Sequence, residues 1–271
     1  MKKLISWFAI LFFCCFSTFP ILYVISISLR GDNAFGTRSL ILIDASSTIR
    51  NYIDLFTSTP FLLWLKNSLY VSGVVTLVGI ILAATSGYAI SRYEFKGRKF
   101  MLMSLITTQM FPATMLMLPF FIVLSKLHLI NKFLGLIIIY SSTALPFCIW
   151  QMKGYFDTIP KELEEAARLD GCSPFQIFYK IILPISLPAL VITGLFSFMS
   201  SWSEYLVAAI TLQDPELYTL PLGLKSFQAS LATQWGLYAA GALVVSIPVV
   251  ILFIMISKYL VSGLTVGSVK G

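Results

Sequence analysis

The sequence predicts an all-α, polytopic membrane protein with about six transmembrane helices in a single transmembrane domain, residues 1–271. Two observations about composition support this. Of the 271 residues, 58% are apolar and only 11% are charged, and the mean hydropathy is +0.87, whereas soluble domains carry about 25% charged residues. The apolar residues also gather in six runs, each about as long as the 20 residues that a spanning helix needs.

The six runs are the expected spans, and each is expected to be helical because lipid offers no partner for an open backbone. They cover residues 5–29, 67–91, 100–125, 133–152, 184–212 and 235–257. Prolines within or next to five of these runs predict kinks: Pro20, Pro112, Pro119, Pro146, Pro188 and Pro248. A cleaved signal peptide is the alternative for the first run, but its apolar core would be only about 7–15 residues long. We therefore expect a retained span.

The basic residues predict the orientation of the chain. With the amino terminus inside, twelve of the 19 Lys and Arg residues fall on inner segments, and the short loop Arg92–Lys99 contains four of them. Excess Lys and Arg mark the cytoplasmic side, so both termini are expected to be cytoplasmic. This distribution accounts for the net charge of +7 without a nucleic-acid partner. The outer segment 30–66 is the longest loop and shows no clear periodicity.

The sequence offers no obvious metal or catalytic centre. Cys14, Cys15, Cys148 and Cys172 have no CxxC spacing, and His128 is the sole histidine. We interpret the cysteines as packing residues. A membrane-embedded enzyme would need paired polar groups at one depth, and no such pair is evident.

A polar segment, residues 158–183, interrupts the apolar pattern between the fourth and fifth runs. Thr158 or Ile159 is expected to cap a helix whose first position is Pro160. Acidic residues then fill the first turns, where negative charge suits the helix dipole, and small apolar residues form a stripe at i, i+3 and i+4. These are Glu162, Glu164 and Glu165, and Leu163, Ala166 and Ala167.

Gly171 is expected to end this helix in a left-handed conformation, and Ser173 and Pro174 to cap a second short helix. The segment is therefore predicted to be a helix, a glycine elbow and a second helix. Ala166 and Ala167 would allow close approach of another protein. An ordinary solvated loop is the alternative.

This segment resembles the signature loop of permease subunits in bacterial ATP-binding-cassette importers. The resemblance rests on the run Glu164-Glu165-Ala166-Ala167-Arg168-Leu169-Asp170-Gly171 and on the closing Leu183-Pro184. The stretches Gly87–Arg92, Gln109–Pro112 and Lys153–Phe156 are similar to the carbohydrate-uptake branch, and Leu260–Gly271 is similar to the end of the second permease subunit of maltose and maltodextrin importers. The resemblance covers residues 67–271 and departs at residues 30–66 and 225–235.

The resemblance implies a non-enzymatic transport subunit in the bacterial inner membrane, with no cofactor of its own. ATP would be bound by a separate ATPase dimer, since the chain lacks a phosphate-cradling Gly-Lys-Ser/Thr loop. The implied partners are that ATPase, a second permease subunit, an extracytoplasmic solute-binding protein, membrane lipid and a carbohydrate substrate. The implied ATPase-coupling residues are Glu164, Glu165, Ala166, Ala167, Asp170 and Gly171, and the implied contacts in the tail, residues 260–271, are Gly263, Leu264, Thr265, Gly267 and Lys270.

Glu204, which follows Trp202, is the only acidic residue within an expected span. An ionisable residue inside the membrane is a functional candidate, so both residues are candidates for lining the translocation path. An interhelical hydrogen bond is the alternative role for Glu204. Two other functions remain open: the same role for a polyol or glycerol phosphate, and, more remotely, an ion-coupled secondary transporter.

Overall fold

Helices make up nearly all of the secondary structure. The computed structural model describes residues 2–31, 47–228 and 233–266, with side chains described between residues 5 and 257 of these ranges. Within this part of the chain there is no β-strand, only an isolated antiparallel bridge between Arg30 and Ser47. The prediction of an all-α chain is confirmed.

The chain divides into two compact units, and two of the three boundaries between them fall inside long helices. Unit 1, residues 1–66 and 218–248, contains α1 (Lys2–Ser28), α2 (Arg50–Thr57), the start of α3 (Phe61–Arg92), α12 (Leu220–Lys225) and the first part of α13 (Trp235–Val266). Unit 2, residues 67–217 and 249–271, contains most of α3, α4 (Arg98–Thr108), α5 (Ala113–Lys126), α6 (Phe133–Thr158), α7 (Glu162–Leu169), α8 (Pro174–Ile177), the π-helix η1 (Phe178–Ile182), α9 (Leu183–Ile185), α10 (Leu187–Trp202), α11 (Leu206–Thr211), the 3-10 helix η2 (Pro215–Leu217) and the rest of α13.

Unit 1 contains a helix that the sequence analysis did not anticipate. Part of the loop expected over residues 30–66 forms α2, and α3 begins at Phe61, before the expected span. The Asn51 side chain donates hydrogen bonds to the carbonyl oxygens of Ser28 (2.9 Å) and Arg30 (2.7 Å), which fixes α2 to the end of α1. The cap of α1 thus comes from a residue more than 20 positions away, which a local pattern does not reveal.

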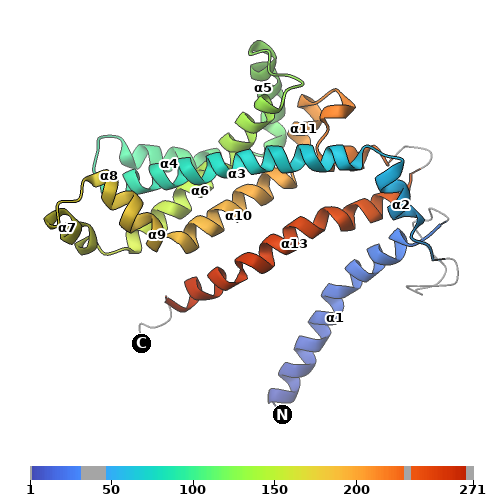
Figure 1. The fold of residues 1–271 in the computed structure, drawn as a ribbon, viewed down its shortest axis with the longest axis horizontal. Helices are drawn as coiled ribbons and strands as arrows, with labels where there is room; N and C mark the ends of the chain where they lie inside the picture. Colours follow the sequence, from blue (N-terminus) through green and yellow to red (C-terminus); the bar gives the residue numbers. More distant parts are fainter. Residues whose placement is uncertain (1, 32–46, 229–232, 267–271) are drawn as a thin grey trace. The chain divides into compact units, whose positions relative to one another are not determined.

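In unit 2, small residues allow α3 to pack closely against α6 and α10 (Figure 1). A Cβ atom added at Gly87 would lie 2.9 Å from Cβ of Met152 on α6. One added at Gly194 of α10 would lie 2.8 Å from Cδ1 of Ile80 on α3. At Gly87 the backbone nitrogen of Lys153 would also lie at 3.0 Å, so a larger residue would require α3 and α6 to move apart, whereas at Gly194 the end of the Ile80 side chain would have to shift. Close approach through small residues is how helices associate in membranes.

Among the described residues, four helices are long and apolar enough to span a membrane, or six if two bent helix pairs each form one span. The four are α1, α3, α6 and α13, with candidate segments Ile5–Ser28, Phe61–Arg92, Phe133–Thr158 and Trp235–Ser257. The bent pairs are α4 with α5, at 104°, and residues Pro174–Ile185 with α10, at 78°. About six spans is consistent with this architecture.

Two expected spans are corrected because they are not continuous helices. The run 100–125 breaks between Thr108 and Ala113, where Pro112 has no N–H group and restricts the residue before it. The run 184–212 ends as a helix at Trp202, and a new short helix, α11, begins at Leu206. Pro184 and Pro188 lie on either side of the bend before α10.

Candidate functional site

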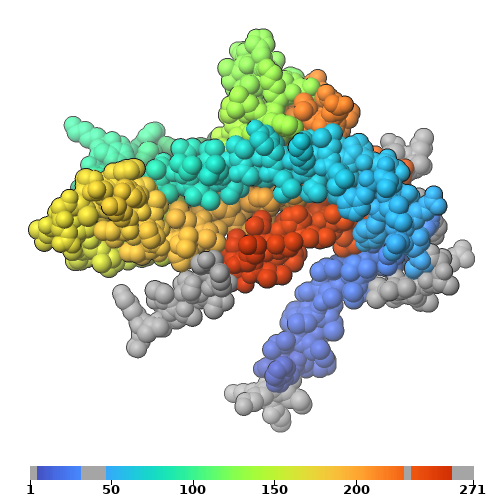
Figure 2. Space-filling view, in the orientation of Figure 1, coloured from blue at the N-terminus to red at the C-terminus, as the bar shows by residue number. Residues whose placement is uncertain are grey.

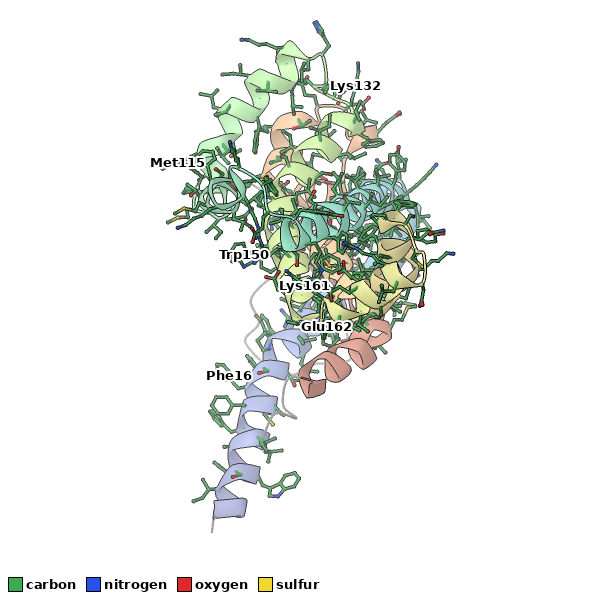
Figure 3. The ribbon with its side chains drawn as sticks, turned by 90° about the vertical axis from the view of Figure 1, so that its left-hand side faces the viewer. Phe16, Met115, Lys132, Trp150, Lys161 and Glu162 are labelled. Carbon is green, nitrogen blue, oxygen red and sulfur yellow. The ribbon has the colours of Figure 1, made fainter. Side chains whose placement is uncertain are left out.

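The polar segment forms the elbow that the sequence predicts, although it begins later than expected. Helix α6 continues to Thr158, and α7 begins at Glu162 rather than at Pro160. Figure 3 labels Lys161 and Glu162, where the chain enters α7. The first turn of α7 contains Glu162, Glu164 and Glu165, where acidic side chains complement the helix dipole.

The turn after α7 is a Schellman motif centred on Gly171. Gly171 has a φ of +84°, as predicted. Its N–H donates to the carbonyl of Arg168 (3.0 Å), and the N–H of Cys172 donates to the carbonyl of Ala167 (3.0 Å). These are the two hydrogen bonds that define the motif. The space around Gly171 is open, so the requirement for glycine comes from the backbone conformation alone.

The second helix begins with a capping box. The hydroxyl of Ser173 accepts a hydrogen bond from the backbone N–H of Gln176, and the Gln176 side chain accepts one from the backbone N–H of Ser173. Pro174 occupies the first turn. The predicted cap is confirmed, and the reciprocal bond from Gln176 fits the Ser-x-x-Gln spacing of this motif. Local hydrogen bonds therefore fix the turn between α7 and α8 on both of its sides.

One face of the elbow is buried against the ends of α3 and α6. Ala167 and Ile177 belong to an apolar cluster with Tyr88, Met152 and Phe156. The Tyr88 ring lies 4.8 Å from the Phe178 ring and 5.7 Å from the Phe156 ring, between centroids. This packing holds the elbow at one end of these helices, where Figures 1 and 2 show it.

A buried ion pair joins α7 to the end of α3. The guanidinium of Arg92 contacts the carboxylate of Glu164, and each side chain is only 6% exposed. The Tyr88 hydroxyl donates to the second oxygen of the same carboxylate at 2.8 Å, and Arg92 also donates to the carbonyl of Ile159 at 2.9 Å. Breaking such a pair is strongly destabilising because it leaves an uncompensated buried charge. These contacts join three helices at one point.

The opposite face of the elbow is exposed and partly apolar. Leu169 is 91% exposed and Phe175 is 72% exposed, while Glu165 and Ala166 are also exposed. We call these four residues the outer face. Large apolar side chains rimmed by charged residues are typical of a surface that binds another protein. The elbow is thus a rigid element with a secured inner side and a free outer face.

A second feature of unit 2 is a cavity of about 500 Å³, bounded by the break between α4 and α5, by α6, and by the break between α10 and α11. Glu204 is one of the residues that line it. The Glu204 carboxylate accepts hydrogen bonds from the backbone N–H groups of Val207 (3.0 Å) and Ala208 (3.4 Å), so it caps α11. It therefore satisfies backbone donors where the expected fifth span is interrupted.

The family of the chain follows from comparison with known proteins. Residues 75–265 match the family described as "Binding-protein-dependent transport system inner membrane component". The chain belongs to this family.

This permease is similar over its whole length to known transport proteins. It is 34% identical to a maltose/maltodextrin transport system permease protein of Salmonella typhimurium, with 100% of this chain and 97% of that protein covered. It is 32% identical to an arabinooligosaccharides transport system permease protein of Halalkalibacterium halodurans, with 100% and 98% covered. Its fold matches a chain from the crystal structure of a bacterial transporter that imports the acidic polysaccharide alginate, with a TM-score of 0.82 and 24% identity, covering 95% and 96% of the two chains.

The permease structure divides the predicted coupling residues between two faces. Glu164 and Ala167 are each 5% exposed and point into the protein, whereas Glu165, Ala166, Asp170 and Gly171 are exposed. The expectation that Ala166 and Ala167 form one contact face is corrected. Successive residues on a helix lie about 100° apart, so a helix that buries Ala167 can expose Ala166.

Four residues that form or contact the elbow were given no role from the sequence. On α3, Arg92 was recognised only as an orienting charge and Tyr88 only within a family motif. Their spacing of four residues places them on one face of α3, which was a usable signal. Leu169 and Phe175 were not singled out, although Leu169 lies four residues after Glu165 on the outer face.

Two other predictions fall outside the elbow. Trp202 is 2% exposed and stacks on Phe198, with 5.2 Å between ring centroids, and it does not line the cavity. In the expected tail, α13 continues to Val266, so Gly263, Leu264 and Thr265 have a helical backbone. Gly267 and Lys270 lie outside the described residues.

Proposed function

We propose that this permease forms part of the membrane path of an ATP-driven importer for a sugar or oligosaccharide. The observation that carries the proposal is the elbow, in which a free apolar outer face belongs to a rigidly anchored α7–α8 segment. A second permease subunit and an ATPase dimer complete the importer. A solute-binding protein on the outer side delivers the substrate, in keeping with the family description. The sugar class rests on the names of the relatives.

In this proposal the outer face docks on the ATPase. Leu169 and Phe175 supply the apolar contact, and Glu165 and Asp170 supply charge at its rim. The distribution of Lys and Arg, which predicts cytoplasmic termini, supports this docking because it predicts that the outer face lies on the cytoplasmic side with the ATPase. The end of the chain, including Gly263, Leu264, Thr265, Gly267 and Lys270, forms a second contact with the ATPase.

The inner face of the elbow, made of the buried residues Glu164 and Ala167, transmits the movement of the ATPase to the membrane helices. ATP shifts the importer between two states only if it binds one of them more tightly. The resulting movement reaches the membrane helices only through rigid contacts. The Arg92–Glu164 pair and the packing of Ala167 provide such contacts between α7 and the ends of α3 and α6. Glu164 and Ala167 thus have positioning roles.

A charge placed on the outer face tests this docking. Leu169→Glu should abolish co-purification of the ATPase and ATP-driven uptake, because it puts a charge into an apolar contact. Leu169→Met is the matched control, since it keeps an apolar side chain of similar size, and it should preserve both. The amount of permease in the membrane should be unchanged in both variants. Normal co-purification of the ATPase with the Leu169→Glu variant would refute docking through this face.

A further inference from the structure

The cavity near Glu204 has the size and lining of a small-molecule site. Its volume of about 500 Å³ lies within the range of about 300–1,000 Å³ that is usual for ligand pockets. Aromatic side chains, including Phe111, Phe120 and Tyr140, form part of its wall. Polar side chains from α6 and from the two helix breaks form another part: Gln109, Ser142, Thr143 and Glu204. An aromatic wall with polar groups suits a ligand that has both apolar and polar faces.

The polar groups of this cavity offer mainly hydrogen-bond acceptors. The Ser142 hydroxyl already donates to the carbonyl of Ile139 (2.8 Å), and the Thr143 hydroxyl donates to that of Tyr140 (3.1 Å). A hydroxyl whose hydrogen is used keeps its acceptor lone pairs. The Gln109 amide nitrogen uses one of its two N–H groups to donate to the carbonyl of Thr143 (3.0 Å), and its amide oxygen is a further acceptor. A complementary ligand must therefore supply several donors, as sugar hydroxyl groups do.

The charge of the cavity limits the ligand further. Its described lining contains no Lys, Arg or His, and it contains the carboxylate of Glu204. A carboxylate or phosphate on the ligand would meet no cation from this subunit and would be repelled by Glu204. Burying an unpaired charge is costly, and a like charge adds to that cost. The lining therefore favours a neutral polyhydroxy ligand over an acidic sugar or a glycerol phosphate.

We propose that this cavity is a direct subsite for a neutral oligosaccharide, contacted by Gln109, Ser142, Thr143 and Glu204. The proposal rests on the proposed importer function and adds two points. This subunit itself contacts the substrate, and its lining selects against acidic substrates. The selection arises from acceptor oxygens and one carboxylate rather than from the overall shape of the cavity.

Equilibrium binding to the purified complete importer, without ATP or binding protein, tests the subsite. The probes are tritium-labelled malto-, arabino- and galacto-trisaccharides and an alginate trisaccharide as the acidic counterpart. At least one neutral trisaccharide should bind, and the alginate trisaccharide should bind at least about tenfold more weakly. Ser142→Leu should weaken binding of the neutral trisaccharide about tenfold, because it removes an acceptor and fills space. Glu204→Gln should reduce the difference in binding affinity between neutral and acidic trisaccharides.

Ser104→Leu is the matched control. Ser104 also donates to its own helix, at the carbonyl of Phe100 (3.0 Å), and it does not line the cavity. This variant should bind the neutral trisaccharide as the unmodified importer does. Failure of every neutral trisaccharide to bind, equal binding of the acidic one, or an unchanged affinity in Ser142→Leu would each overturn the subsite. Failure of ATPase docking is a separate result, since it is read from ATPase co-purification and ATP-driven uptake of the Leu169→Glu variant, which the binding measurement does not use.

Discussion

Two glutamates show how differently one residue type can be used in this permease. Glu164 lies in a buried contact with the guanidinium of Arg92 and also accepts a hydrogen bond from Tyr88. Glu204 accepts hydrogen bonds from the backbone N–H groups of Val207 and Ala208 and lines a cavity. The first carboxylate has a buried counter-charge. The second has the backbone N–H groups at the start of a helix as its partners, and it lines a cavity.

The difference in partners indicates that Glu164 connects structural elements, whereas Glu204 belongs to a candidate ligand site. The contacts of Glu164 join α7 to α3, so their loss should affect the connection between the elbow and the membrane helices. The Glu204 carboxylate caps the start of α11, and the Glu204 carbonyl accepts a hydrogen bond from the Tyr140 hydroxyl on α6 (3.4 Å). Both contacts lie beside the cavity, so replacement of Glu204 should affect the cavity more than the assembly.

Removing one partner of the buried pair should have the largest effect. Arg92→Met leaves the Glu164 carboxylate without its counter-charge, which costs about 3–5 kcal/mol. We expect loss of ATP-driven uptake and a lower melting temperature of the purified complex. Arg168→Met, at an exposed position on α7, is the control. The double variant Arg92→Met/Glu164→Met should regain stability, because no charge is then left unpaired. If the single variant transports normally, the pair has no positioning role.

A bulky residue should act differently on the two faces of α7. Ala167→Trp forces a large ring into the packed cluster beside Met152 and Phe156, at a cost of about 1–3 kcal/mol or more. It should lower both the melting temperature and co-purification of the ATPase. Ala166→Trp lies on the outer face and should lower co-purification only. Equal melting temperatures for the two variants would contradict the assignment of faces.

The effect of replacing Gly171 should depend on how readily the new residue adopts a left-handed backbone conformation. Gly171 has a left-handed conformation and open space around it, and this conformation costs most other residues about 1–2 kcal/mol. Gly171→Val should therefore reduce uptake, whereas Gly171→Asn should retain most of it, since Asn adopts this conformation readily. Initial rates of uptake in proteoliposomes distinguish the two variants. Equal rates would show that the turn is not constrained.

The smallest effect on assembly is expected at Glu204. Glu204→Ala removes the cap of α11, which costs about 0.5–2 kcal/mol, while Glu204→Gln keeps an acceptor oxygen. The melting temperature should fall slightly for the Ala variant and hardly at all for the Gln variant. Both should still co-purify with the ATPase. Loss of the complex in Glu204→Gln would instead favour a role in helix packing.

The elbow was largely predictable because its determinants are local. Gly171, Ser173 and Pro174 each act through backbone conformation or through bonds within a few residues. The apolar runs likewise predict helices, because the membrane imposes one solution on them. The breaks were less predictable. Pro112 was recognised as a possible kink. The second break, where α10 ends at Trp202 and Glu204 caps α11, was not predicted, because a single acidic residue in an apolar run does not indicate a helix cap.

That this chain is a helical membrane protein with a polar elbow follows from its amino-acid sequence, since composition, helix length and caps are local properties. Which side of the elbow is buried depends on contacts between residues that are far apart in the chain. Glu164 and Arg92 are 72 positions apart, and they meet because α3 and α6 pack together where glycine allows close approach. The role of each glutamate follows from the partners that folding brings to it, and sequence spacing alone does not identify those partners.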